Sequence, residues 1–305
     1  MNKIFNYISD QFVFQNLKKI SYGYLNLVDT NGKEYFFGDS KSFLKVKLKI
    51  NNPSFCFNIL RKGSSGLGES YINGEFETDN LTSLIELSAK NINITYKFSG
   101  FFQFSLLQNF LRRKIFNNTK ARSKKNISLH YDLGNEFFST WLDKTLTYSC
   151  GIFNSSNETL EKAQINKYNK LINMVKPKNG DKILEIGCGW GGFAEHLAKN
   201  YNIKLDCITI SKKQFLFTKE RIRKARLNHK VNVQMLDYRD VKNKYDIIVS
   251  IEMIEAVGEK YLDKYFNIIK ENLAPGGRGA IQAIIIKDEL YERYRNKEDF
   301  IQKYI

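Results

Sequence analysis

The sequence lacks the features that mark secreted, zinc-binding and membrane-spanning proteins. Its four cysteines lie far apart and form no C-x-x-C pair, so neither a disulfide framework nor a zinc site is indicated. No apolar run approaches the ~18 residues of a transmembrane helix, and no hydrophobic leader is present. Only three prolines and no low-complexity tract occur, which argues against disorder. We expect a cytoplasmic protein without a metal site, and any membrane contact should be peripheral.

Acidic residues are missing from one long stretch, since none occurs between Glu86 and Asp132. Cations there alternate with phenylalanine and leucine, and such a segment can face anionic headgroups at about 1 kcal/mol per charge. An ordinary core helix followed by a solvated basic linker explains this composition equally well. Nucleic acid is not expected as a partner, because no binding motif accompanies the patch. The cations are Lys90, Lys97, Arg112, Arg113, Lys114, Lys120, Arg122, Lys124 and Lys125.

The residue patterns divide the chain into two domains. Residues 1–117 are predicted as a smaller α+β domain, 118–126 as a basic linker, and 127–305 as a second domain that begins with helix up to about Val175. The first domain combines a strand-like alternation with turn signals and helical periodicity. The strand-like alternation lies at 42–50, the turn signals at 31–32 and 63–66, and the helical periodicity at 81–88.

Strand-like and helix-like segments alternate through the second domain. Such alternation predicts a doubly wound α/β fold with a mainly parallel sheet and helices on both faces. A last helix is expected from about Asp288 to the end of the chain. The predicted strands are 182–186, 204–210, 231–236, 245–251 and 279–286.

A glycine-rich turn, ILEIGCGWGGF at 183–193, follows the first of these strands. Gly187 and Gly189 have no Cβ, so they can take positive φ and leave room for a nucleoside at the strand end. The spacing G-x-G-x-G-G differs from the G-x-G-x-x-G of dinucleotide folds, and no phosphate-binding Gly-Lys-Ser/Thr follows. The turn resembles the S-adenosylmethionine turn of class I methyltransferases. A tight turn with a purely structural role is the alternative.

Further motifs occur in order along the chain. They are GLGESY at 66–71, GEF at 74–76, HYDLGN at 130–135, LTYSC at 146–150, TISKKQ at 209–214, DYRD at 237–240, SIEMIEAVG at 250–258 and DFIQKYI at 299–305. With these motifs the chain resembles the cyclopropane-fatty-acid synthase family of class I methyltransferases. The resemblance implies methyl transfer from S-adenosylmethionine to the cis double bond of a phospholipid acyl chain, giving cyclopropane or methyl-branched products.

The resemblance and the basic stretch together indicate the partners. We expect an unsaturated phospholipid substrate, an anionic bilayer surface, a homodimer, and a peripheral location at the inner face of the membrane. Two alternatives stay open. One is a methyltransferase for a small soluble acceptor, because neighbouring families share the glycine turn. The other is a non-catalytic lipid-binding relative.

The family's reaction defines what the catalytic site must supply. An alkene is a weak nucleophile, so methyl transfer builds a carbocation, and a base must take a methyl proton as the ring closes. Family members hold bicarbonate for that step. By motif, the resemblance places Cys150 and Glu255 in its cradle, with Tyr131 close by and the backbone of Ile284 as a further contact. Alternatively, Cys150 is a small buried residue and Glu255 a carboxylate at a helix N-terminus.

Two departures from the family pattern leave the product open. Where the best-studied branch has a histidine after the fifth strand, this chain has Gln282, which can donate a hydrogen bond but cannot take a proton near neutral pH. The relatives also continue past the position of Ile305 into an aromatic-rich tail with two more strands. We therefore expect a catalytic domain of five strands that is incomplete at its C-terminus.

The methionine side of the cofactor is expected near the glycine turn. Glu185 and the two turn glycines would line the methionine and the ribose, with Trp190 near the sulfonium as a cation-π partner. Tyr148 and Ser149 would close over the methionine end.

The ribose and adenine are expected at the next two strand ends. A typical class I enzyme ends its second strand with an acidic residue for the ribose hydroxyls, but Asp206 lies too early, in mid-strand. Thr209 and Gln214 are the residues offered here instead. Asp237 and Tyr238, after the third strand, are predicted to lie at the adenine edge.

Overall fold

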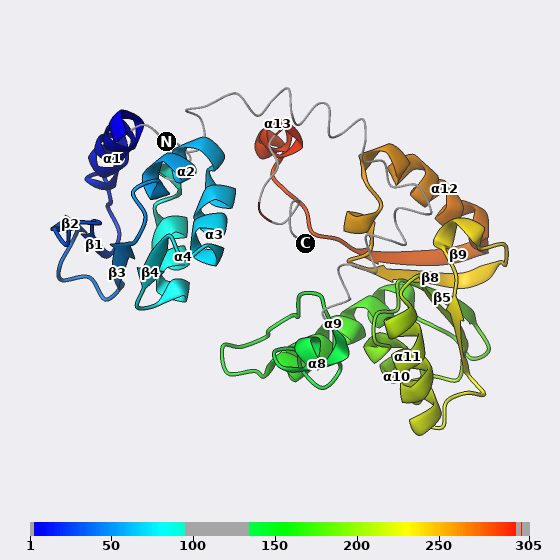
Figure 1. Cartoon of the computed structure of the whole chain (residues 1–305). Coiled ribbons are helices and arrows are strands. Elements are labelled where there is room, and N and C mark those ends of the chain that lie inside the picture. The colour runs from blue at the N-terminus through cyan, green and yellow to red at the C-terminus, as the bar shows by residue number, and fades with distance from the viewer. Residues whose placement is uncertain (1–2, 95–133, 297–299, 301–305) are drawn as a thin grey trace. The chain divides into compact units, whose positions relative to one another are not determined.

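The computed structural model describes residues 3–94, 134–296 and 300. The chain divides into two compact units, of which unit 1 holds residues 1–115 and 287–305 and unit 2 holds 116–286 (Figure 1). Most of the predicted basic stretch, the linker and Tyr131 lie outside the described residues.

Unit 1 contains a four-stranded mixed sheet in the order β2-β1-β3-β4. β1 pairs antiparallel with β2 and parallel with β3, and β3 pairs antiparallel with β4. In β3, Val46, Leu48 and Ile50 are buried and alternate with exposed lysines, as the sequence alternation predicts. The elements are α1 (Lys3–Leu17), β1 (Tyr24–Val28), β2 (Glu34–Gly38), β3 (Lys45–Ile50), α2 (Phe55–Lys62), α3 (Ser64–Ile72), β4 (Phe76–Thr78), α4 (Leu81–Lys90) and α13 (Asp288–Asn296).

The turn predicted at 63–66 is wrong beyond its first residue. Gly63 separates α2 from α3, but Gly66 lies inside α3. A Cβ built on Gly66 would lie 2.3 Å from the backbone oxygen of Asn58 in α2. The glycine therefore allows two helices to pack closely, which a sequence pattern cannot distinguish from a turn.

Unit 2 contains a five-stranded sheet in the order β7-β6-β5-β8-β9, and all four pairings are parallel. The predicted α/β fold with a mainly parallel sheet is confirmed. The elements are α8 (Gly134–Ser139), α9 (Leu160–Val175), β5 (Lys182–Ile186), α10 (Gly192–Asn200), β6 (Lys204–Thr209), α11 (Lys212–Lys224), β7 (Val231–Met235), η1 (Tyr238–Asp240), β8 (Tyr245–Ile251), η2 (Ile254–Ala256), η3 (Glu259–Tyr261), α12 (Leu262–Asn272) and β9 (Leu273–Gln282).

The sheet of unit 2 is buried on both faces. Neighbouring residues of β5 point to opposite sides: Ile183 packs with α9, α10 and α11, whereas Leu184 packs with α12. Both side chains are 1% exposed, and full burial of such a side chain contributes roughly 1.5–3 kcal/mol. Within the ranges that the structure describes, no helix is both long and apolar enough to cross a membrane.

Two predicted boundaries in unit 2 are wrong. No helix connects α8 with α9, although the sequence predicts continuous helix there. Asp143 accepts hydrogen bonds from the backbone and the hydroxyl of Thr145 at 2.9 Å, and Leu146 has a φ of 53°, so the chain turns instead of continuing as a helix. In addition, β9 ends at Gln282, which leaves Ile284 beyond the strand.

Candidate active site

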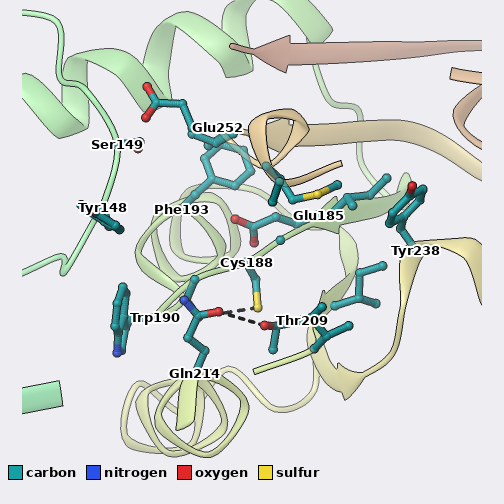
Figure 2. A pocket seen from close by; sticks show the side chains of 18 of the residues that line it. Tyr148, Ser149, Glu185, Cys188, Trp190, Phe193, Thr209, Gln214, Tyr238 and Glu252 are labelled. Atoms are coloured by element: carbon teal, nitrogen blue, oxygen red, sulfur yellow. Dashed lines mark hydrogen bonds between the residues drawn. The ribbon is translucent and has the colours of Figure 1, made fainter. Parts of the chain in front are cut away.

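The carboxyl ends of the parallel strands of unit 2 border a hollow of ≈ 1120 Å³, open solvent included. Figure 2 shows Glu185 near its centre, with Tyr148 and Trp190 to one side and Tyr238 to the other. All ten residues that the sequence assigns to the cofactor line it: Tyr148, Ser149, Glu185, Gly187, Gly189, Trp190, Thr209, Gln214, Asp237 and Tyr238. Their contact with a cofactor stays a prediction.

The glycine turn between β5 and α10 lines the hollow. Gly187 and Gly189 have φ values of 82° and 52°, in the left-handed region that favours glycine. A Cβ on Gly187 would lie 2.8 Å from the side chain of Met253, whereas a Cβ on Gly189 would meet nothing within 4 Å. The Gly189 carbonyl accepts a hydrogen bond from Thr218 in α11 at 3.0 Å. The turn is thus fixed in place and leaves open space above Gly189.

Glu185, at the end of β5, is a buried carboxylic acid with 2% of its surface exposed. The hydrogen bond that the structure records to it comes from the Cys207 thiol, at 3.4 Å. Burial raises the pKa of Glu185 to about 8, and this thiol opposes the rise only weakly. The side chain is therefore protonated near neutral pH until a cationic or hydrogen-bonding ligand favours its charged form.

The pKa of Glu185 makes the stability of unit 2 dependent on pH. Between the unfolded pKa of about 4.5 and the folded value of about 8, the folded state keeps a proton that the unfolded state releases, so stability falls as pH rises. Glu185→Gln should remove up to about 1.4 kcal/mol of this fall per pH unit. The measurement is urea unfolding between pH ~5 and ~7, followed by tryptophan fluorescence. Exposed Glu271→Gln is the control, and equal pH slopes in wild type and Glu185→Gln would contradict the assignment.

An aromatic group forms one side of the hollow. Trp190 is 2% exposed, packs against Phe138 at 4.8 Å between ring centroids, and donates a hydrogen bond from Nε1 to Asn135 at 2.8 Å. Tyr148 lies 5.4 Å from Phe138. Asn135 ends the HYDLGN motif, so the structure gives this motif a role in holding the Trp190 ring.

The ends of β6 and β7 carry polar pairs. Thr209 donates a hydrogen bond to Gln214 at 2.9 Å, and both side chains are buried. Asp206 lies inside β6, as expected, and accepts a hydrogen bond from Tyr245 at 2.8 Å, away from the hollow. Asp237 and Arg239 form an ion pair with N···O at 2.6 Å. The carboxylate predicted at the adenine edge is therefore held in a fixed orientation by the guanidinium.

A second polar cluster lies beside the hollow. Gln282 Nε2 donates to Glu252 Oε1 at 2.7 Å and contacts Cys150 Sγ at 3.2 Å. The backbone N–H of Cys150 donates to the same Glu252 oxygen at 3.1 Å. Cys150 is exposed, so it is not the small buried residue that the alternative interpretation expected. Partial burial and the adjacent Glu252 carboxylate raise the pKa of the thiol, so it stays protonated near neutral pH.

Glu255 lies close to this cluster in η2. Its Oε1 accepts a hydrogen bond from the backbone N–H of Ile284 at 2.6 Å. The carboxylate thus contacts the residue that the family resemblance pairs with it, and it also lies in the first turn of a three-residue 3-10 helix, where its side chain forms no cap hydrogen bond. Neither Glu255 nor Ile284 lines the hollow itself.

Glu252 belongs to the candidate site, although the sequence did not predict it as a site residue. It lines the hollow and joins Cys150 to Gln282. Its φ of 47° is unusual for a residue with a side chain, and its N–H donates to the Gln282 carbonyl at 2.9 Å. The SIEMIEAVG motif contains two glutamates, and nothing in the sequence shows which of them the backbone turns toward Cys150.

Among the described residues, no group of three or more His, Cys, Asp or Glu side chains is arranged to hold a metal ion.

A family profile described as mycolic acid cyclopropane synthetase matches residues 118–305. The chain is 33% identical over 289 residues to tuberculostearic acid methyltransferase UfaA1 of Mycobacterium tuberculosis, covering 92% of this chain and 66% of the relative. It is 34% identical over 262 residues to cyclopropane-fatty-acyl-phospholipid synthase of Escherichia coli, covering 85% and 65%.

The fold has solved counterparts. Mycolic acid cyclopropane synthase CmaA1, complexed with SAH and CTAB, has a TM-score of 0.53 and 28% identity, covering 56% of this chain and 61% of that one. Cyclopropane synthase MmaA2 from Mycobacterium tuberculosis has a TM-score of 0.52 and 24% identity, covering 59% and 71%. The chain spans about two thirds of the length of the two curated relatives. With its parallel sheet, its glycine turn and this match, the chain belongs to the mycolic acid cyclopropane synthetase family, whose fold is that of class I methyltransferases.

Proposed function

We propose that the protein transfers a methyl group from S-adenosylmethionine to the cis double bond of unsaturated phospholipid acyl chains. The observation that carries this proposal is the position of two sites next to each other. The hollow at the ends of β5, β6 and β8 has the residues expected for the methyl donor, and the cluster of Cys150, Glu252 and Gln282 adjoins it. The curated relatives named above support the lipid acceptor.

The chemistry requires two functions beyond binding the donor. The sulfur–methyl bond breaks as a carbon–carbon bond forms, which leaves a cation on the second olefinic carbon, and loss of a methyl proton then closes the ring. Tyr148 and Trp190 line the hollow, and aromatic rings stabilise cations that lie over their faces. Trp190 is buried and held by Phe138 and Asn135, so its ring needs little reorganisation when the charge develops.

The residues beside the hollow fit a small oxyanion such as bicarbonate. The amide of Gln282 and the backbone N–H groups of Cys150 and Ile284 all donate to carboxylate oxygens, those of Glu252 and Glu255. An oxyanion could take the place of either carboxylate oxygen on these donors. When bound there, bicarbonate would supply the proton acceptor that Gln282, an amide, cannot be.

The proposed reaction is tested by mass spectrometry of lipids from a host that expresses the chain. We expect a gain of one CH2 per unsaturated chain in phospholipids, and fragmentation tells a ring from a branch. Unchanged lipids, together with methyl transfer to a soluble amine by the purified protein, would favour the small-acceptor alternative. Unchanged lipids with no methyl transfer at all would favour the lipid-binding alternative.

The phospholipid substrate implies contact with a membrane surface. We propose a peripheral location at the cytoplasmic face and assign the contact to the basic stretch between Glu86 and Asp132, with a homodimer as the assembly. Charge reversal of Arg112, Arg113 and Lys114 to glutamate should weaken the affinity for anionic vesicles by at least about 100-fold, because loss of three cations at about 1 kcal/mol each already gives roughly that factor. The measurement is the bound fraction at low salt, where screening is weak.

A control for this experiment uses other lysines of the chain. Lys170, Lys178 and Lys182 are exposed and lie outside the basic stretch, so reversing them changes the net charge equally. Equal losses in both triple variants would show an unspecific charge effect and would overturn the assignment of this stretch.

A further inference from the structure

Lys167 is the most deeply buried cation in the described part of unit 2. It lies on α9, where the buried face runs through Ala163, Gln164, Lys167, Tyr168 and Leu171. Only 1% of its surface is exposed, and the structure records no ion pair for it among the described residues. Burying an ammonium group is costly, so this side chain needs a compensating role.

The one hydrogen bond that the structure records for this ammonium leads to the wall of the hollow. Lys167 Nζ donates to the Ser149 hydroxyl at 2.6 Å. Gln164, one helical turn earlier and also 1% exposed, donates to the Ser149 backbone carbonyl at 2.8 Å. Two buried side chains of α9 therefore fix both the backbone and the hydroxyl of Ser149. Ser149 lines the hollow, whereas Lys167 does not.

The direction of the Lys167 hydrogen bond determines what Ser149 can do. Because the ammonium has no acceptor, the serine oxygen must accept, and its own proton is left to point elsewhere. Within the described ranges, no acceptor for that proton is recorded. Ser149 therefore presents a donor hydroxyl to the hollow, with a positive charge 2.6 Å behind it.

The charges around the hollow indicate that the ligand group bound by the Ser149 hydroxyl is an anion. Glu185 and Glu252 line it, and their carboxyl oxygens suit cationic or hydroxyl groups of a ligand. The lining cation Arg239 is already neutralised by Asp237 at 2.6 Å. Burial lowers the pKa of Lys167 to about 8 while Glu252 opposes the change, so the ammonium is still charged near neutral pH. Among the described residues near the hollow, Lys167 thus supplies a positive charge that is not held in an ion pair and can act on an anionic ligand group through Ser149.

Resting on the proposed function, we infer that Lys167 is a positioning residue that turns Ser149 into the recognition point for the carboxylate of the methyl donor. Lys167 acts through the serine and does not touch the ligand. It thereby favours a donor that carries an amino-acid carboxylate over one that lacks it.

The test compares two ligands that differ by the carboxylate alone, S-adenosylhomocysteine and its decarboxylated form. Lys167→Met keeps the length of the side chain but removes the donor and the charge. Its affinity for S-adenosylhomocysteine should fall by about ten-fold or more, while its affinity for the decarboxylated form stays within about two-fold. Lys170→Met, the same change at an exposed position of α9, is the control and should alter neither affinity.

A merely structural role would give a different result. If Lys167 only maintained the shape of the wall, Lys167→Met would weaken both ligands equally, and the inference would fall. Ser149→Ala should lose the same selectivity for S-adenosylhomocysteine over its decarboxylated form. A double variant with Lys167→Met and Ser149→Ala should lose no more of this selectivity than either single variant. Should Lys167→Met not fold, Ser149→Ala decides alone: an unchanged ratio of the two affinities overturns the inference.

The same titrations separate this inference from the proposed function. Wild-type protein that binds neither ligand would refute the methyl-donor site itself. Wild-type protein that binds S-adenosylhomocysteine, together with a Lys167→Met variant of unchanged selectivity, would refute the role of Lys167 alone.

Discussion

Gly189→Leu should abolish binding of S-adenosylhomocysteine, with a loss of affinity of at least about 100-fold by calorimetry. A Cβ at Gly189 meets no protein atom within 4 Å, so the leucine side chain would project into the space reserved for the ligand. The φ of 52° adds backbone strain of roughly 1–2 kcal/mol to the folded state. Binding and stability must therefore be measured separately.

Gly180→Leu is the matched control for this prediction. Gly180 also has a positive φ, 85°, with nothing within 4 Å of a built Cβ, but it lies in the turn before β5 and is exposed. It should lose a similar amount of stability and bind the ligand normally. A Gly189→Leu protein that melts like Gly180→Leu and still binds would show that the ligand does not lie over the glycine turn.

Glu255→Gln should reduce methyl transfer to lipid by about 100-fold or more while leaving S-adenosylhomocysteine affinity near normal. The amide keeps the size of the side chain but removes the negative charge facing the N–H of Ile284. Glu255 does not line the hollow, which is why donor binding should persist. The measurements are product formation by mass spectrometry and calorimetry on the same preparation.

The control for Glu255 is Glu271→Gln, an exposed glutamate whose change should leave both activity and binding intact. A fully active Glu255→Gln protein would remove this carboxylate from the mechanism. Glu252 would then be the carboxylate to change next, because it contacts both Cys150 and Gln282.

Features set by local patterns were predicted well from the sequence. β5 and β8 have the predicted bounds, and the glycine turn follows β5 as expected. Apolar runs indicate buried strands and glycines indicate turns at their own positions in the chain. Parallel strands then bring their carboxyl ends to one edge of the sheet. This explains why Glu185, which lies in β5, and Tyr238, which follows β7, border one hollow, whereas Tyr148 follows no strand and was expected there from the family resemblance.

Features set by contacts between distant segments were not predicted. Glu252 adopts its left-handed backbone through a hydrogen bond to Gln282, thirty positions away. Lys167 lies on a helix where a lysine would ordinarily face solvent, and its burial depends on contacts such as the hydrogen bond to Ser149 and the position of Nζ 5.4 Å from the ring centroid of Tyr168. One local feature was missed as well: the turn after Asp143 replaces a predicted helix because hydrogen bonds from Thr145 to the Asp143 side chain compete with helical ones.

Within the ranges that the structure describes, the residues that border the hollow lie between Leu146 and Val257, inside unit 2. The candidate donor site is thus lined by one stretch of sequence, and Asn135, which precedes it, supports that lining through its hydrogen bond from Trp190. Cys150, Glu252 and Glu255 lie in the same stretch, so the residues proposed for the donor and those proposed for the chemistry are inherited together as one segment.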